Sequence, residues 1–135
     1  MTDVEVRKYV VTGYQALGDR FFVQKNGDKN LATLMQIRLD IRQVGGPPGH
    51  HATLAVIEFG TRAEQFQIGS LAPRAPHSDQ FGLDVSLPAA DFNHYWAILT
   101  DIGQTHLRCE IERSPERNIT DFQIMSRKHI ETVPS

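Results

Sequence analysis

The feature of this sequence that most constrains its fold is a regular alternation of apolar and polar residues. From Gln80 to Leu87, four apolar residues alternate with four small or polar ones. The segments 35–42 and 107–112 alternate in the same way. Because successive side chains of a β-strand point to opposite faces, this period of two predicts strands with one buried and one solvated face. Such strands are typical of antiparallel sheets.

Weaker patterns predict further strands, which lie at 4–12, 21–23, 53–59, 62–68 and 119–127. In the first of these segments we expect Val4, Val6 and Val10 to lie on one face, although Lys8 breaks the pattern. The segment 53–59 is apolar on both faces, which is typical of a central strand that is covered on each side. Turn signals separate the strands, at Asn26-Gly27, Gly60-Thr61 and 114–118.

One helix is predicted over residues 88–101. Pro88 suits a first turn because an N–H at that position would have no helical partner, and Asp91 complements the helix dipole. The apolar residues that follow recur at the spacing of a single helical face: Phe92, Tyr95, Trp96 and Leu99. We expect this apolar stripe to pack against an open end of the sheets.

Together these elements predict an all-β fold of about eight strands with one short α-helix. Turns at intervals of roughly eight to twelve residues indicate an antiparallel β-sandwich or, alternatively, a flattened barrel. The chain has 135 residues, which is enough to bury a core without disulfides or metals. No repeat or linker divides it, so we expect residues 1–135 to form a single β-sandwich domain.

Charge and hydropathy argue against two classes of partner. Fourteen basic and sixteen acidic residues give a net charge of −2, which lacks the basic excess typical of nucleic-acid-binding proteins. No apolar run approaches the roughly 20 residues of a membrane-spanning helix. We therefore predict neither a nucleic acid nor a membrane as partner. An N-terminus without an apolar signal core and a single cysteine, Cys109, favour a reducing, cytoplasmic location.

The stretch from Gly45 to His51 combines glycine, proline and two histidines just before a predicted strand. With Glu58 downstream it invites comparison with the cupins, whose metal site uses a His-x-His pair and a later glutamate. That pair works because alternate strand residues share a face, whereas the adjacent His50 and His51 point to opposite faces. We therefore predict no metal and no cofactor. A solvated loop with two exposed imidazoles remains a candidate binding surface.

A second cluster, His77-Ser78-Asp79, contains the residue types of a hydrolytic triad. Triad members meet through the fold rather than in sequence, and the chain has no Gly-x-Ser-x-Gly elbow that would expose an activated serine. We interpret the cluster as a turn, in which Ser78 and Asp79 bond to nearby backbone. His77 and Asp79 are kept as candidate binding residues.

Charged residues line the polar faces of two predicted strands. Arg38, Asp40 and Arg42 share one such face, and a mixed-charge surface of this kind can recognise a partner by complementarity. Arg38 and Arg42 are therefore candidate binding residues. Cys109 falls on the apolar face of its strand, which predicts a buried side chain rather than a nucleophile.

These observations favour a non-enzymatic binding or assembly module that acts through protein–protein contacts. The partner would be another protein or a second copy of the chain, most simply in a homodimer. Edge strands expose unpaired backbone groups, and Lys8 and Glu64 are the main candidates to block them. The alternative is a small-molecule or metal-dependent enzyme with a cupin-like pocket built from the His50/His51 loop, His77 and Asp79. Convergence of those side chains on one concave pocket would favour the enzyme.

Overall fold

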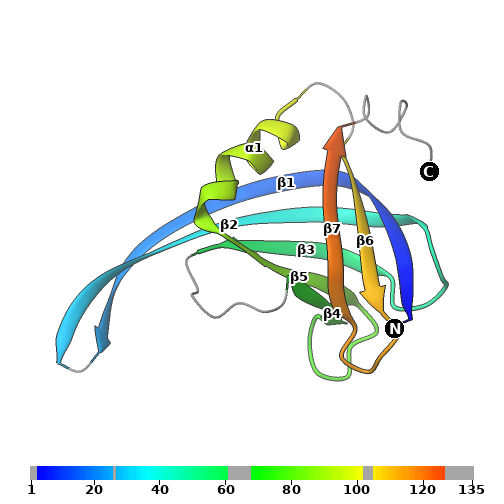
Figure 1. Cartoon of the computed structure of the whole chain (residues 1–135), viewed down its shortest axis with the longest axis horizontal. Coiled ribbons are helices and arrows are strands. Elements are labelled where there is room, and N and C mark those ends of the chain that lie inside the picture. Colours follow the sequence, from blue (N-terminus) through cyan, green and yellow to red (C-terminus); the bar gives the residue numbers. More distant parts are fainter. Residues whose placement is uncertain (1–2, 26, 61–67, 102–104, 127–135) are drawn as a thin grey trace.

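Seven strands and one short helix occupy the part of the chain that the structure, a computed structural model, describes: residues 3–25, 27–60, 68–101 and 105–126 (Figure 1). The strands are β1 (Val4–Lys25), β2 (Asp28–Gly45), β3 (Ala52–Phe59), β4 (Gly69–Pro73), β5 (Phe81–Leu87), β6 (Thr105–Glu112) and β7 (Asn118–Ser126). A single 3-10 turn, η1 (Ala89–Asp91), leads into α1 (Phe92–Leu99). The prediction of an all-β fold with one short helix is confirmed.

The strands form one sheet that closes into a barrel, in the order β1-β2-β3-β5-β4-β7-β6. The architecture is thus the barrel that the sequence left as the alternative to two packed sheets. All neighbouring strands are antiparallel except β3 and β5, which run parallel. The parallel pair arises because β4 and β5 form an antiparallel pair whose β5 side, rather than its β4 side, lies against β3. The strand expected over 62–68 falls almost wholly on residues 61–67, outside the described ranges.

The barrel is closed at its shortest pairing, between β4 and β7. Gly69 and Ser70 are the only β4 residues in register with β7 among the described residues, and the N–H of Leu71 donates to the carbonyl of Arg117 at 3.0 Å. Gly69 also lies against β5, where a Cβ would collide with the carbonyl oxygen of Asp84. Only glycine therefore lets β4 approach β5 closely enough for this closure.

The core fills the inside of the barrel, and β1 presents a different face to it from the one that its sequence suggests. Arg7 is in register with Cys109 and Tyr9 with Leu107, and Tyr9, Cys109 and Leu107 belong to the buried core cluster. Because residues opposite each other in a sheet share a face, Arg7 and Tyr9 point inward. Val4, Val6 and Val10 share one face, as predicted, but it is the face opposite Arg7 and Tyr9; Val10 is buried there, and Val4 and Val6 are half-buried. Cys109 is fully buried, as predicted.

The helix lies where the sequence predicts it and covers one end of the barrel. Its aromatic residues contact three strands: Phe92 packs edge-on against Phe59 of β3 at 5.2 Å between ring centroids, and Tyr95 stacks on Phe122 of β7 at 6.3 Å. Trp96 meets Tyr14 of β1 edge-on at 5.6 Å. Within the described ranges, no helix combines the length and hydropathy needed to cross a membrane.

The first two strands continue far beyond the barrel. β6 pairs with β1 only as far as Val10, and β3 pairs with β2 only from Met35 to Asp40. The β1–β2 pairing nevertheless runs on to Lys25↔Asp28, and this hairpin projects from the barrel as a curved two-stranded ribbon, at the left of Figure 1. We call residues 19–25 and 28–34 the arm. A register shift between Val11 and Gly13 marks the point where β1 leaves its pairing with β6.

Candidate functional site: a polar barrel mouth and a free strand edge

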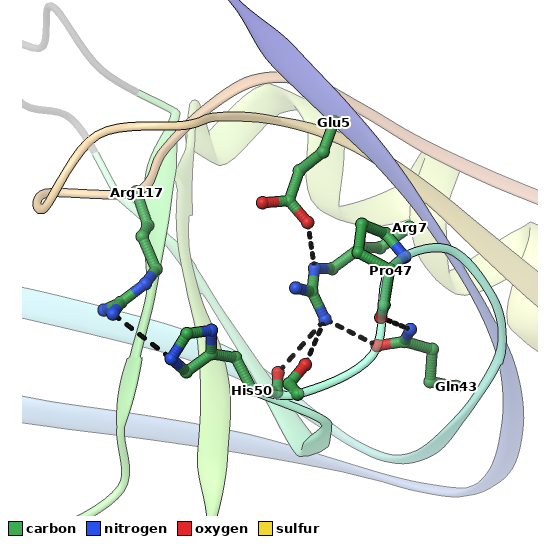
Figure 2. Close-up of polar contacts among 7 residues, drawn as sticks. Glu5, Arg7, Gln43, Pro47, His50 and Arg117 are labelled. Atoms are coloured by element: carbon green, nitrogen blue, oxygen red, sulfur yellow. Dashed lines mark hydrogen bonds and ion pairs between the residues drawn. The ribbon is translucent and has the colours of Figure 1, made fainter.

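Three loops meet at the end of the barrel opposite α1. They are the β2–β3 loop (46–51), the β4–β5 loop (74–80) and the β6–β7 loop (113–117). We call the side chains of Glu5, Arg7, His50, Phe81 and Arg117 at this end the barrel mouth (Figure 2 shows all of them except Phe81).

Arg7 holds the β2–β3 loop against the barrel. Its side chain is 2% exposed, and its Nε donates to Oε2 of Glu5 at 2.7 Å. Its Nη1 donates to Oε1 of Gln43 at 2.9 Å and to the Gly49 carbonyl at 2.7 Å. Gly46, the first residue of this loop, has a φ of +119° and lies close to β1. A Cβ at Gly46 would be 2.7 Å from the Val6 carbonyl oxygen. The loop conformation therefore depends on one glycine and one buried guanidinium.

His50, Phe81 and Arg117 form a contiguous contact at the barrel mouth. The His50 ring meets Phe81 edge-on at 4.6 Å, and Nη2 of Arg117 lies 3.3 Å from His50 Nε2. The Arg117 guanidinium also sits 5.5 Å from the centre of the Phe81 ring. A guanidinium can only donate, so this contact favours an imidazole whose Nε2 accepts. Desolvation and the charges of Arg117 and Arg7 lower the pKa of His50.

The other predicted loop residues lie nearby without joining this contact. His51, His77 and Asp79 are exposed, and in the described structure none of them bonds to His50. The β4–β5 loop has the bonds of a turn: the N–H of Ser78 donates to the Ala75 carbonyl at 3.1 Å, and that of Gln80 to Ser78 Oγ at 3.0 Å. Among the described residues, no group of three or more His, Cys, Asp or Glu side chains is placed to hold a metal ion.

The predicted charged face of β2 is on the outside of the barrel. Arg38, Asp40 and Arg42 are all exposed there. Arg38 donates from Nε to Oε1 of Gln36 at 3.0 Å and lies in register with Gln15 of β1. This face thus borders the part of β1 that extends past β6.

The outer edge of β1, from Val11 to Lys25, is the longest strand edge that no described strand covers. Tyr14 and Leu17 are 47% and 42% exposed beside it, although both are large and apolar. The segment contains no proline. Lys8, predicted to block an edge strand, is not at this edge, because it lies between Arg108 of β6 and Gly45 of β2 inside the sheet. Glu64 lies outside the described residues.

Sequence patterns point to only part of these two surfaces. Arg7 and Arg117 carry no local signal for the barrel mouth, because the loop contacts that place them there are to residues 42 and 67 positions away. The arm does have a local sequence signal, because Asn26-Gly27 is a two-residue turn motif and Gly27 adopts a φ of +82°. Extending both strands symmetrically from that turn would have joined segments that we predicted as separate strands.

No protein-family model matches this chain, and neither the curated proteins nor the solved structures include a significant match to it.

Proposed function

We propose that this protein is a non-enzymatic assembly module that associates with further copies of itself through the free edge of β1. The observation that carries the proposal is the length of that edge, which runs from Val11 to Lys25 without a neighbouring strand in the described structure. Unpaired N–H and C=O groups along an extended strand are a template for pairing with another strand. Proteins that stay monomeric usually block such an edge with a proline or a bulge, or cover it.

The side chains beside the edge support association rather than solvation. Tyr14 and Leu17 expose nearly half of their surfaces, and burying them at an interface would remove apolar area from water at about 25 cal/mol per Å². The neighbouring outer face of β2 adds Arg38 and Asp40, charges of opposite sign that can set the register between two copies. A strand added to this edge would extend the sheet by main-chain hydrogen bonds.

A two-fold dimer is the simplest product, because it is the commonest closed symmetry and lets the same edge serve both copies. We place this association in a reducing, cytoplasmic environment, where the lone Cys109 needs no disulfide partner. The arm lengthens the pairing edge, because β1 continues onto a ribbon that projects away from the barrel (Figure 1).

Shortening the arm tests the proposal. Replacing residues 19–34 with Asn-Gly would connect Gly18 to Met35 by a two-residue turn and keep all β1–β6 and β2–β3 register pairs. Sedimentation velocity at micromolar concentration should show an oligomer for the natural chain and a smaller species for the shortened one. Far-UV circular dichroism and thermal unfolding check that the barrel is retained. A natural chain that sediments only as the 15.2 kDa monomer would contradict the proposal.

Two exposed apolar side chains provide a matched pair of point variants. Leu17→Ser, beside the free edge, should weaken association about tenfold, which corresponds to roughly 1.4 kcal/mol. Val44→Ser should leave it unchanged, because Val44 is 51% exposed but lies near the end of β2, away from the arm. Equal effects of the two substitutions would show that the interface lies elsewhere.

A further inference from the structure

We propose that the barrel mouth binds a small oxyanion, a carboxylate or phosphate group, between Arg7, His50 and Arg117. This inference is independent of association through β1, because the loops of the barrel mouth and the arm lie at different ends of the molecule (Figure 1).

The first support is an unused donor on a buried cation. Nε of Arg7 donates to Glu5, and Nη1 donates to Gln43 and the loop carbonyls. No such hydrogen bond of Nη2 to a protein acceptor is found among the described residues. Figure 2 shows Nη2 on the side of the guanidinium that faces away from Gln43 and toward His50 and Arg117. A guanidinium has five N–H donors, and Nη2 is not one of the fully buried atoms that lack a partner in the described structure, so it is open to a ligand. An anion on this side would use the Nη2 donors that the loop leaves free.

The second support is the charge balance. Glu5 is the only carboxylate that pairs with Arg7, and Arg117 has no carboxylate partner in the described structure. Glu5 is thus the one carboxylate that the described structure pairs with a guanidinium of the barrel mouth. Arg117 contacts the imidazole of His50 and the face of Phe81. An oxyanion would complement these two cations, since guanidinium groups bind carboxylate and phosphate oxygens with charge-assisted hydrogen bonds.

The third support lies deeper on the same inner face of β1. Tyr9, two residues beyond Arg7, is fully buried, and its hydroxyl has no hydrogen-bond partner in the described structure. Burial raises the pKa of this hydroxyl, as does Cys109, and the side chain of Arg7 lies close enough to act on it directly. Because a guanidinium can only donate, the proton of the Tyr9 hydroxyl is a second donor at this end of the barrel with no acceptor among the described residues.

The pKa of His50 provides a measure of anion binding at the barrel mouth. This pKa is lowered by desolvation and by the charges of Arg117 and Arg7, while the charge of Glu5 acts in the opposite direction. An anion between the two guanidinium groups would offset their repulsion of a protonated imidazole, and the pKa of His50 would rise toward its usual value. Binding and protonation of His50 are therefore coupled, and each must strengthen the other.

The experiment follows the ring resonances of His50 by NMR during titration with inorganic phosphate, sodium acetate or sodium chloride at constant ionic strength. Phosphate or acetate should bind saturably, with a dissociation constant on the order of 1 mM, and should raise the pKa of His50. Preference for phosphate would identify a phosphate site, and equal or stronger binding of acetate would identify a carboxylate site.

Two arginines of the same region serve as test and control. Arg117→Gln should weaken binding at least about tenfold, which corresponds to roughly 1.4 kcal/mol. Arg113→Gln should leave it unchanged, since Arg113 belongs to the same loop but pairs with Asp3 at 3.2 Å. The proposal is overturned if chloride produces the same shift, if no anion saturates the resonance, or if both substitutions weaken binding equally.

Discussion

Replacing Arg7 with methionine tests whether a buried guanidinium organises the barrel mouth. Methionine keeps the length and the apolar part of the side chain but removes the charge and all donors. The variant loses the 2.7 Å ion pair with Glu5 and the hydrogen bonds to Gln43 and the Gly49 carbonyl. Hydrogen bonds to charged groups contribute about 1.5–3 kcal/mol each, and breaking a buried ion pair from one side costs about 3–5 kcal/mol.

The net loss should be smaller than the sum of these terms. Glu5 is 14% exposed and so regains part of its hydration, and the Gly49 carbonyl belongs to an exposed residue that water can reach. We therefore expect the free energy of unfolding to fall by about 3 kcal/mol. Urea denaturation measures this quantity, and an unchanged slope with denaturant would show that the fold is retained.

A second variant separates the ion pair from packing. In Glu5→Gln/Arg7→Met neither charge remains, so the double variant should be about 1–2 kcal/mol more stable than Arg7→Met alone. A loss below about 1 kcal/mol in Arg7→Met would refute the reasoning. So would a double variant that loses the full sum of the two single effects, because the charges would then be uncoupled.

Three further predictions concern the barrel and its helix. Gly69→Ala should destabilise the protein by about 3 kcal/mol or more in urea unfolding, since its Cβ would collide with Asp84, whereas Gly18→Ala meets nothing within 4 Å and should be neutral. Burial raises the pKa of Cys109 to about 12, so a thiol reagent at pH 8 should modify it only after unfolding; reaction at the rate of a free thiol would contradict this. Because the unfolded thiol ionises first, stability should also fall as the pH rises from about 9 to 12, and Cys109→Ala should reduce that slope. Trp96→Ala should lower stability by about 2 kcal/mol, less than for a fully buried aromatic ring, and an unchanged thermal midpoint would show that the stripe does not pack on the barrel.

Local patterns determine much of this protein because the backbone itself imposes their periods. The alternation around Leu83 and Cys109 gives strands with the correct buried face, since side chains of any strand alternate. The apolar spacing from Phe92 to Leu99 gives the helix for the same reason. The exposure of His50 and His51 follows from the glycines and prolines around them, which do not suit a strand interior.

The inward position of Arg7 is decided by tertiary structure alone. A shift of one residue moves every side chain of a strand to the other face, and Val4, Val6 and Val10 make the wrong face of β1 look apolar. The actual face is selected by Glu5 and by loop carbonyls from the end of β2, which satisfy the guanidinium inside the barrel. Glu5 is a local partner, but the loop carbonyls are more than 40 residues away and are not visible in the local sequence.

The order of the strands is also beyond the reach of local patterns. A strand carries the same alternation whichever neighbours it has, so nothing in 53–59 or 80–87 indicates that β3 and β5 pair in parallel. Likewise, His50 and Arg117 are 67 residues apart and meet only because the barrel closes between β4 and β7. Periodicity determines which way a side chain faces within its own element, whereas the partners across the sheet depend on the free energy of the whole chain.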